Sequence, residues 1–94
     1  MPIPFSARVR IAPEVMVREV GGESVLLDLK TERYLGLNES GTRVWQALME
    51  SASIGAAYEK LLAEYDVAPA ELEGDLRELI DRLLENVLIV VESQ

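Results

Sequence analysis

The hydrophobic pattern of the chain changes its period at Asn38, and this change constrains the fold more than any other feature. Before Asn38, short runs of branched residues alternate with polar ones, which is typical of β-strands. After it, apolar residues recur every three or four positions, which is typical of amphipathic helices. A chain of 94 residues has room for one modest core. We therefore expect residues 1–94 to form a single α+β domain, with residues 1–13 extended or flexible.

The first half predicts a three-stranded antiparallel sheet. The runs Val15–Val20 and Ser24–Leu29 flank Gly21 and Gly22, and two glycines between alternating runs are typical of a hairpin. After a second turn, Arg33–Leu37 forms the third strand. In the simplest topology the three strands follow one another across the sheet, so that the third strand lies at an edge.

This third strand is a candidate binding edge. It contains no proline, and its only charge is Arg33 at its start. Soluble proteins usually protect edge strands from pairing by prolines, inward charges or bulges. An open edge can accept an added strand through its free main-chain groups, and Leu35→Pro, which removes a main-chain donor, should weaken such binding. The alternative is that an N-terminal segment such as Val9–Ile11 covers the edge.

The second half predicts three helices. Asn38 is a good N-cap for a helix over Glu39–Glu50, and Ser53 for a second helix. Pro69 suits the first turn of a third helix, because its missing N–H costs nothing there. This helix carries an apolar stripe formed by Leu72, Leu76, Leu79, Ile80, Leu83 and Leu84. The run Val87–Val91 is expected as a short buried strand or an extended tail. Three strands followed by three helices predict a small winged-helix-like domain.

Composition excludes several classes of function. The chain has no cysteine and no histidine, so it lacks thiol nucleophiles, thiolate zinc ligands and imidazole bases. We expect no enzymatic activity, catalytic residue, metal site or cofactor. The longest apolar run, Val87–Val91, is far shorter than the roughly 20 residues that a membrane span needs. The N-terminus also lacks the pattern of a secretory signal, so we expect a cytoplasmic protein with no membrane contact.

The net charge of −8 belongs to the second half of the chain. From Glu50 to Gln94, three basic residues face eleven acidic ones, whereas the first half is balanced. Nucleic-acid affinity depends on Lys and Arg contacts to phosphates, so nucleic acid is an unfavourable partner. An acidic face is compatible with a peptide or protein partner, or it serves solubility alone.

A longer stretch carries a family resemblance. Val25–Trp45 closely resembles the PqqD-like family, whose members have a strand, a turn and a second strand before a Leu-Asn-x-x-Gly-x-x-Val-Trp helix start. The resemblance continues through Leu61–Val67 and Asp75–Leu84, and in all it spans roughly Val15–Val91. One departure is Glu32, because a glycine is common in the family at this point of the turn.

The resemblance implies a recognition element for ribosomally synthesised, post-translationally modified peptides (RiPPs). Such domains hold the leader segment of a precursor peptide and present it to a maturation enzyme. The leader docks as an extra antiparallel strand on the third strand, in the groove between that strand and the third helix. The implied peptide-binding residues are Arg33, Tyr34, Leu35, Gly36, Leu37, Leu72, Asp75, Leu76, Leu79, Arg82 and Leu83.

The resemblance also implies partners. The stretch Asp28–Asn38 looks more like the lasso-peptide members than the pyrroloquinoline quinone members. The implied partners are the leader peptide and a maturation enzyme, such as a leader-cleaving cysteine protease acting with a cyclase. A chaperone for the pyrroloquinoline quinone precursor and a generic acidic winged-helix adaptor are the alternatives. An open strand edge is compatible with a monomer and with a strand-swapped homodimer.

Overall fold

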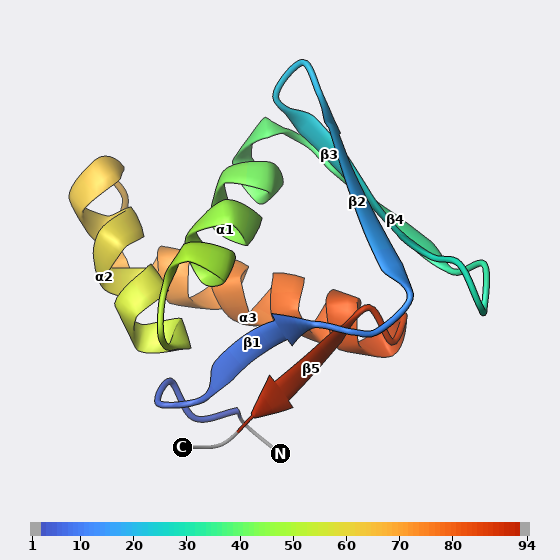
Figure 1. Ribbon diagram of the computed structural model, residues 1–94. Coiled ribbons are helices and arrows are strands. Elements are labelled where there is room, and N and C mark those ends of the chain that lie inside the picture. Colours follow the sequence, from blue (N-terminus) through green and yellow to red (C-terminus); the bar gives the residue numbers. More distant parts are fainter. Residues whose placement is uncertain (1–2, 93–94) are drawn as a thin grey trace.

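The structure, a computed structural model, describes residues 3–92. In chain order its elements are β1 (Arg8–Ile11), β2 (Val15–Val20), β3 (Glu23–Asp28), β4 (Tyr34–Leu37), α1 (Glu39–Glu50), α2 (Ile54–Glu64), α3 (Pro69–Glu85) and β5 (Ile89–Glu92) (Figure 1). The predicted α+β class, with three helices and a three-stranded antiparallel sheet, is confirmed. The winged-helix likeness stays a prediction. Among the described residues, no helix combines the length and apolar character that a membrane span needs.

The larger sheet has the order β2-β3-β4. The loop between β2 and β3 consists of Gly21 and Gly22, whose φ angles are +61° and +86°. A two-residue loop with positive φ at both positions matches the twist of a hairpin, and glycine adopts that conformation without strain. β4 pairs with the other side of β3, with Leu35 opposite Leu26. Within residues 3–92 no strand pairs with the far side of β4, which is therefore an edge strand.

A second sheet, formed by β1 and β5, corrects the prediction of a single sheet. Val9 lies opposite Val91, and Arg10 forms an ion pair with Glu92 at 3.2 Å. In Figure 1 the two strands lie side by side below α1. The sequence does not reveal this pairing, because the partners are 82 positions apart and neither run is long enough to indicate its partner.

The same pairing settles two expectations for the N-terminal segment. The alternative that Val9–Ile11 covers the third predicted strand is wrong, because Val9 and Ile11 pair with β5. Part of the segment expected to be extended or flexible is an ordered strand, with Val9 buried in the core. Residues 1 and 2 of that segment lie outside the described residues.

Both N-caps predicted from the sequence are observed. Asn38 Oδ1 accepts a hydrogen bond from the Gly41 N–H at 2.8 Å, and Ser53 Oγ accepts one from the Ala56 N–H at 3.0 Å. Such side-chain caps satisfy main-chain donors that a helix leaves free at its start. The Asn38 cap thereby fixes the place where β4 ends and α1 begins.

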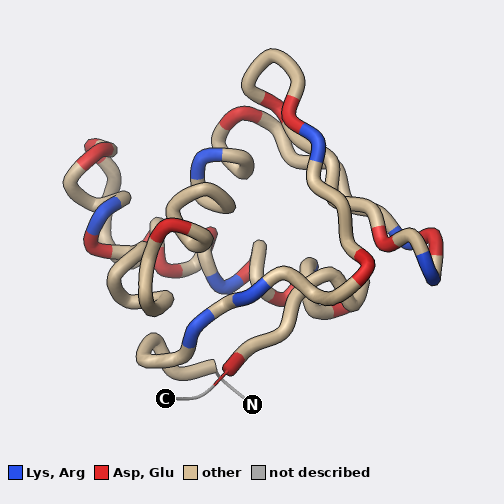
Figure 2. The backbone as a smooth tube through the Cα atoms, in the orientation of Figure 1, with Lys and Arg blue, Asp and Glu red and all other residues tan. Residues whose placement is uncertain are grey.

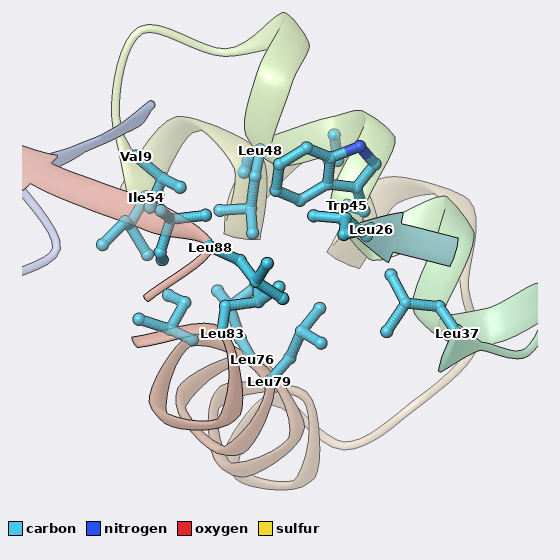
Figure 3. Close-up of a cluster of buried hydrophobic side chains, with 14 of the residues drawn as sticks. Val9, Leu26, Leu37, Trp45, Leu48, Ile54, Leu76, Leu79, Leu83 and Leu88 are labelled. Carbon is cyan, nitrogen blue, oxygen red and sulfur yellow. The ribbon is translucent and has the colours of Figure 1, made fainter. Parts of the chain in front are cut away.

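The core lies between the larger sheet and the helices (Figure 3). Leu26 of β3, Leu76 and Leu83 of α3, and Leu88 before β5 have no exposed surface. Full burial of one such side chain stabilises the fold by about 1.5–3 kcal/mol relative to leaving it exposed. These contacts hold α3 against the sheet, so the spacing between α3 and the neighbouring β4 is fixed by the core.

Candidate functional site

The turn between β3 and β4 sets where the edge strand begins. Asp28 Oδ1 accepts the N–H groups of Lys30 and Thr31 at 2.8 and 3.2 Å, and the Asp28 carbonyl accepts the Glu32 N–H at 2.8 Å. The hydrogen bonds from the Lys30 and Thr31 main chain hold the pKa of Asp28 below its ordinary value. Glu32 has φ +64°, a conformation that favours glycine. The turn therefore retains the glycine-like geometry, and Asp28 organises it.

The pairing register identifies which main-chain groups of the edge strand are free. The Asp28 N–H donates to the Arg33 carbonyl at 2.8 Å, so this pair is a hydrogen-bonded one. Hydrogen-bonded and non-bonded pairs alternate along an antiparallel ladder. Residues 33, 35 and 37 therefore direct their main-chain groups towards β3, whereas Tyr34 and Gly36 direct theirs to the open side. The open edge offers the N–H and C=O groups of these two residues.

The side chains of β4 alternate between the two faces of the sheet. Leu35 and Leu37 are 8% and 6% exposed, and they pack into the core. Tyr34 is 68% exposed on the opposite face. Gly36 shares that outer face, and a Cβ added there would meet no atom within 4 Å. The strand is thus anchored by two leucines and remains accessible along its edge.

A groove of about 520 Å³ lies between β4, the start of α1 and α3. It brings together six of the residues predicted from the sequence to bind a peptide: Gly36, Leu37, Leu72, Asp75, Leu79 and Arg82. The four from α3 recur at helical spacing along one side of the helix. Leu72 and Leu79 are 5% and 7% exposed, so they form an apolar floor, whereas Asp75 and Arg82 are exposed at its rim.

The other five predicted contact residues do not line the groove: Arg33, Tyr34, Leu35, Leu76 and Leu83. Leu76 and Leu83 have no exposed surface and pack in the core, because they occupy the side of α3 that faces the other helices and the sheet. We therefore assign them to the core and not to a binding surface. Arg33 lies outside the groove, and its Nη1 donates to the Glu85 carbonyl at 3.3 Å. This bond ties the start of β4 to the end of α3.

Sequence reasoning missed other residues that line the groove, namely Asn38, Ser40, Gly41, Val44, Tyr65, Val67 and Glu78. Tyr65 and Val67 belong to the connection between α2 and α3, whose position depends on how the helices pack. Glu78 could have been found, because it lies three positions after Asp75 and four before Arg82 on the same side of the helix.

The charged residues at the rim are available to a ligand. Within residues 3–92, Asp75, Glu78 and Arg82 form no ion pair with one another or with other side chains. Earlier on the same helix, Glu73 and Arg77 do pair, at 3.3 Å. In the described part of the chain, no three acidic side chains gather to hold a metal ion. The arrangement suits recognition of an extended polypeptide by main-chain pairing, apolar contact and charge.

The chain is similar to known proteins in sequence and in fold. The family model described as coenzyme PQQ synthesis protein D (PqqD) matches residues 23–89, from the start of β3 to the start of β5. The solved structure of TbiB1 in complex with the TbiA(beta) leader peptide is 32% identical, with a TM-score of 0.77, and the match covers 85% of this chain and 93% of that one.

A second solved structure, lasso peptide synthetase B1 complexed with the leader peptide, is 29% identical, with a TM-score of 0.78. That match covers 88% of this chain and 98% of the other. No curated protein sequence matches the chain. Because the family model matches residues 23–89, which is more than half of the chain, the chain belongs to the PqqD family.

Proposed function

We propose that the protein binds the leader segment of a ribosomally synthesised precursor peptide and presents it to the enzymes that mature it. The leader adds to β4 as an antiparallel strand and places alternate side chains against α3. The protein itself catalyses no reaction. The partner enzymes are of the lasso-peptide type, a leader-cleaving cysteine protease and a cyclase.

The open edge of β4 beside an apolar groove is the observation that carries this proposal. Tyr34 and Gly36 supply two donors and two acceptors to a guest main chain. These hydrogen bonds do not depend on the side chains of the guest, so they tolerate different sequences. Leu72 and Leu79 supply the apolar floor against which alternate guest side chains pack. A leader that is disordered when free gives up about 2–5 kcal/mol on ordering. A Kd between about 1 μM and 1 nM is therefore expected.

The structural neighbours support the choice of guest. Both are complexes with a leader peptide, one of them of a lasso peptide synthetase B1, and each covers more than four fifths of this chain. The family description points instead to coenzyme PQQ synthesis and favours a second candidate, a chaperone for the pyrroloquinoline quinone precursor. Titration with a lasso leader and with that precursor separates the two, since the true substrate should bind more tightly.

A proline at Gly36 tests strand addition. Gly36→Pro removes one outward N–H and leaves the β3–β4 hydrogen bonds in place, because proline is tolerated where the N–H faces away from the sheet. We expect a leader peptide that binds the wild-type protein to bind this variant about ten-fold or more weakly in calorimetry, because a guest carbonyl is left without its donor.

Gly36→Ala is the matched control. It keeps the donor, and its new methyl group enters open space. Its affinity should stay within about two-fold of the wild-type value. Equal binding by the proline and alanine variants, with both folded, would remove strand addition from the proposal.

A further inference from the structure

We propose that the groove selects leaders by the order of their charges, with a basic residue towards the N-terminal end of the docked segment and an acidic residue towards its C-terminal end. This inference rests on the proposed function and adds a specificity rule to it. It depends on two features of the structure: the relative direction of β4 and α3, and the positions of three charged side chains that line the groove, Asp75, Glu78 and Arg82.

β4 and α3 run in opposite directions along the two sides of the groove. The start of β4 lies at the end of α3, because the Arg33 guanidinium donates to the Glu85 carbonyl at 3.3 Å. The end of β4, at Leu37, lies further along the groove, away from this contact. Figure 1 shows the same opposed course, with β4 rising away from the C-terminal end of α3.

A guest strand antiparallel to β4 must therefore run in the same direction as α3. Its N-terminal residues lie near Leu37 and Leu72, and its C-terminal residues lie near Arg82 and Glu85. The polarity of the guest is thus fixed by the pairing, and each end of the guest meets a different part of α3.

The two parts of α3 carry opposite charges towards the groove. Asp75 and Glu78 line its earlier part, and Arg82 lines its later part. Asp81 and Glu85, the other carboxylates of the later part, are exposed and do not line the groove. The groove is therefore acidic where the guest begins and basic where it ends.

The charged residues that line the groove in the described part of the chain do not form ion pairs with one another. Glu78 and Arg82 stand four positions apart on α3, a spacing at which opposite charges can pair, yet within the described residues they form no ion pair. Glu73 and Arg77, with the same spacing but five positions earlier on the helix, pair at 3.3 Å. The groove-lining charges remain able to pair with a guest. Since all three are exposed, each such pair should change affinity by about two- to five-fold.

Selection from a library of random 15-residue peptides tests this rule and does not require the sequence of the natural leader. Wild-type protein should enrich peptides with Lys or Arg on the N-terminal side of their apolar residues and Asp or Glu on the C-terminal side. The triple variant Asp75→Arg, Glu78→Arg, Arg82→Glu should enrich the reverse order. The matched control Asp81→Arg, on the same helix but outside the groove, should enrich the wild-type order.

The outcomes separate this inference from the proposed function. Peptides that are enriched without charge order, yet fail to bind Gly36→Pro, overturn the charge rule and leave strand addition standing. Enriched peptides that bind Gly36→Pro as well as wild type, or no enrichment at all, overturn strand addition and the charge rule with it. If circular dichroism shows the triple variant unfolded, Arg82→Glu alone replaces it and should lose the preference for an acidic C-terminal side.

Discussion

The two outer strands of the larger sheet, β2 and β4, differ in whether a charged side chain protects their open edge. On β2, Glu19 places a carboxylate on the inner face, where it accepts a hydrogen bond from Gln46 Nε2 at 2.8 Å. On β4, no charged residue lies between Tyr34 and Leu37, as Figure 2 shows. An inward charge discourages pairing with another chain, whereas an uncharged edge invites it. The two edges of this sheet therefore differ: the β2 edge is protected by an inward charge, whereas the β4 edge is open to an added strand.

The largest expected effect tests which donors of β4 face outward. Leu35→Pro should destabilise the fold by about 3 kcal/mol or more, because it removes a donor that bonds β3 and a leucine that packs in the core. Gly36→Pro should cost about 1 kcal/mol or less, because its lost donor faces solvent. Denaturant unfolding measures both. Similar losses of stability would mean that the assigned register of the edge strand is wrong.

A proline on the opposite edge tests whether leader binding belongs to β4 alone. The hairpin register directs the Glu19 N–H to the open side of β2, so Glu19→Pro is the counterpart of Gly36→Pro. We expect Glu19→Pro to bind the leader within about two-fold of wild type, while Gly36→Pro loses about ten-fold or more. A large loss in Glu19→Pro, with the protein still folded, would place the guest on β2.

Removal of the inward charge should convert the protected edge into an open one. Glu19→Val removes the carboxylate from the inner face and leaves Arg18 as the only charged residue of β2, so it should raise the fraction of dimer as concentration increases, measured by light scattering. Glu19→Asp is the matched control, because it keeps the carboxylate and should behave like wild type. Unchanged association of Glu19→Val would show that this charge does not protect β2.

The smallest expected effect concerns the turn that leads into β4. The lowered pKa of Asp28 stabilises the fold above its unfolded value of about 3.8, and this contribution is lost as pH falls through the lower folded pKa. Asp28→Asn keeps an acceptor but lacks the charge. Its Tm should therefore lie below that of wild type at pH 7, and the difference should shrink as the solution is acidified. A difference that stays constant with pH would contradict the assignment.

The parts of the molecule that were predictable are those with local signals. The glycines of the β2–β3 hairpin and the caps Asn38 and Ser53 have short-range patterns, and the structure contains each of them. The periodicity of apolar residues also predicted the third strand and the apolar stripe of α3.

The features that the sequence did not predict depend on strand register and on packing between residues far apart in the chain. It did not reveal that β1 pairs with β5, or that Leu76 and Leu83 face the core while Leu72 and Leu79 face the groove. It also suggested Leu35 as the site for a disruptive proline. The outward donors belong to its neighbours Tyr34 and Gly36, because a single residue of register decides which side of a strand each N–H serves.

Amide hydrogen exchange with and without the leader tests the central claim most directly. Strand addition predicts that the Tyr34 and Gly36 amides become protected when the leader binds, while the Leu35 and Leu37 amides, already bonded to β3, change little. Binding that leaves the Gly36 amide as exchangeable as before would contradict the account.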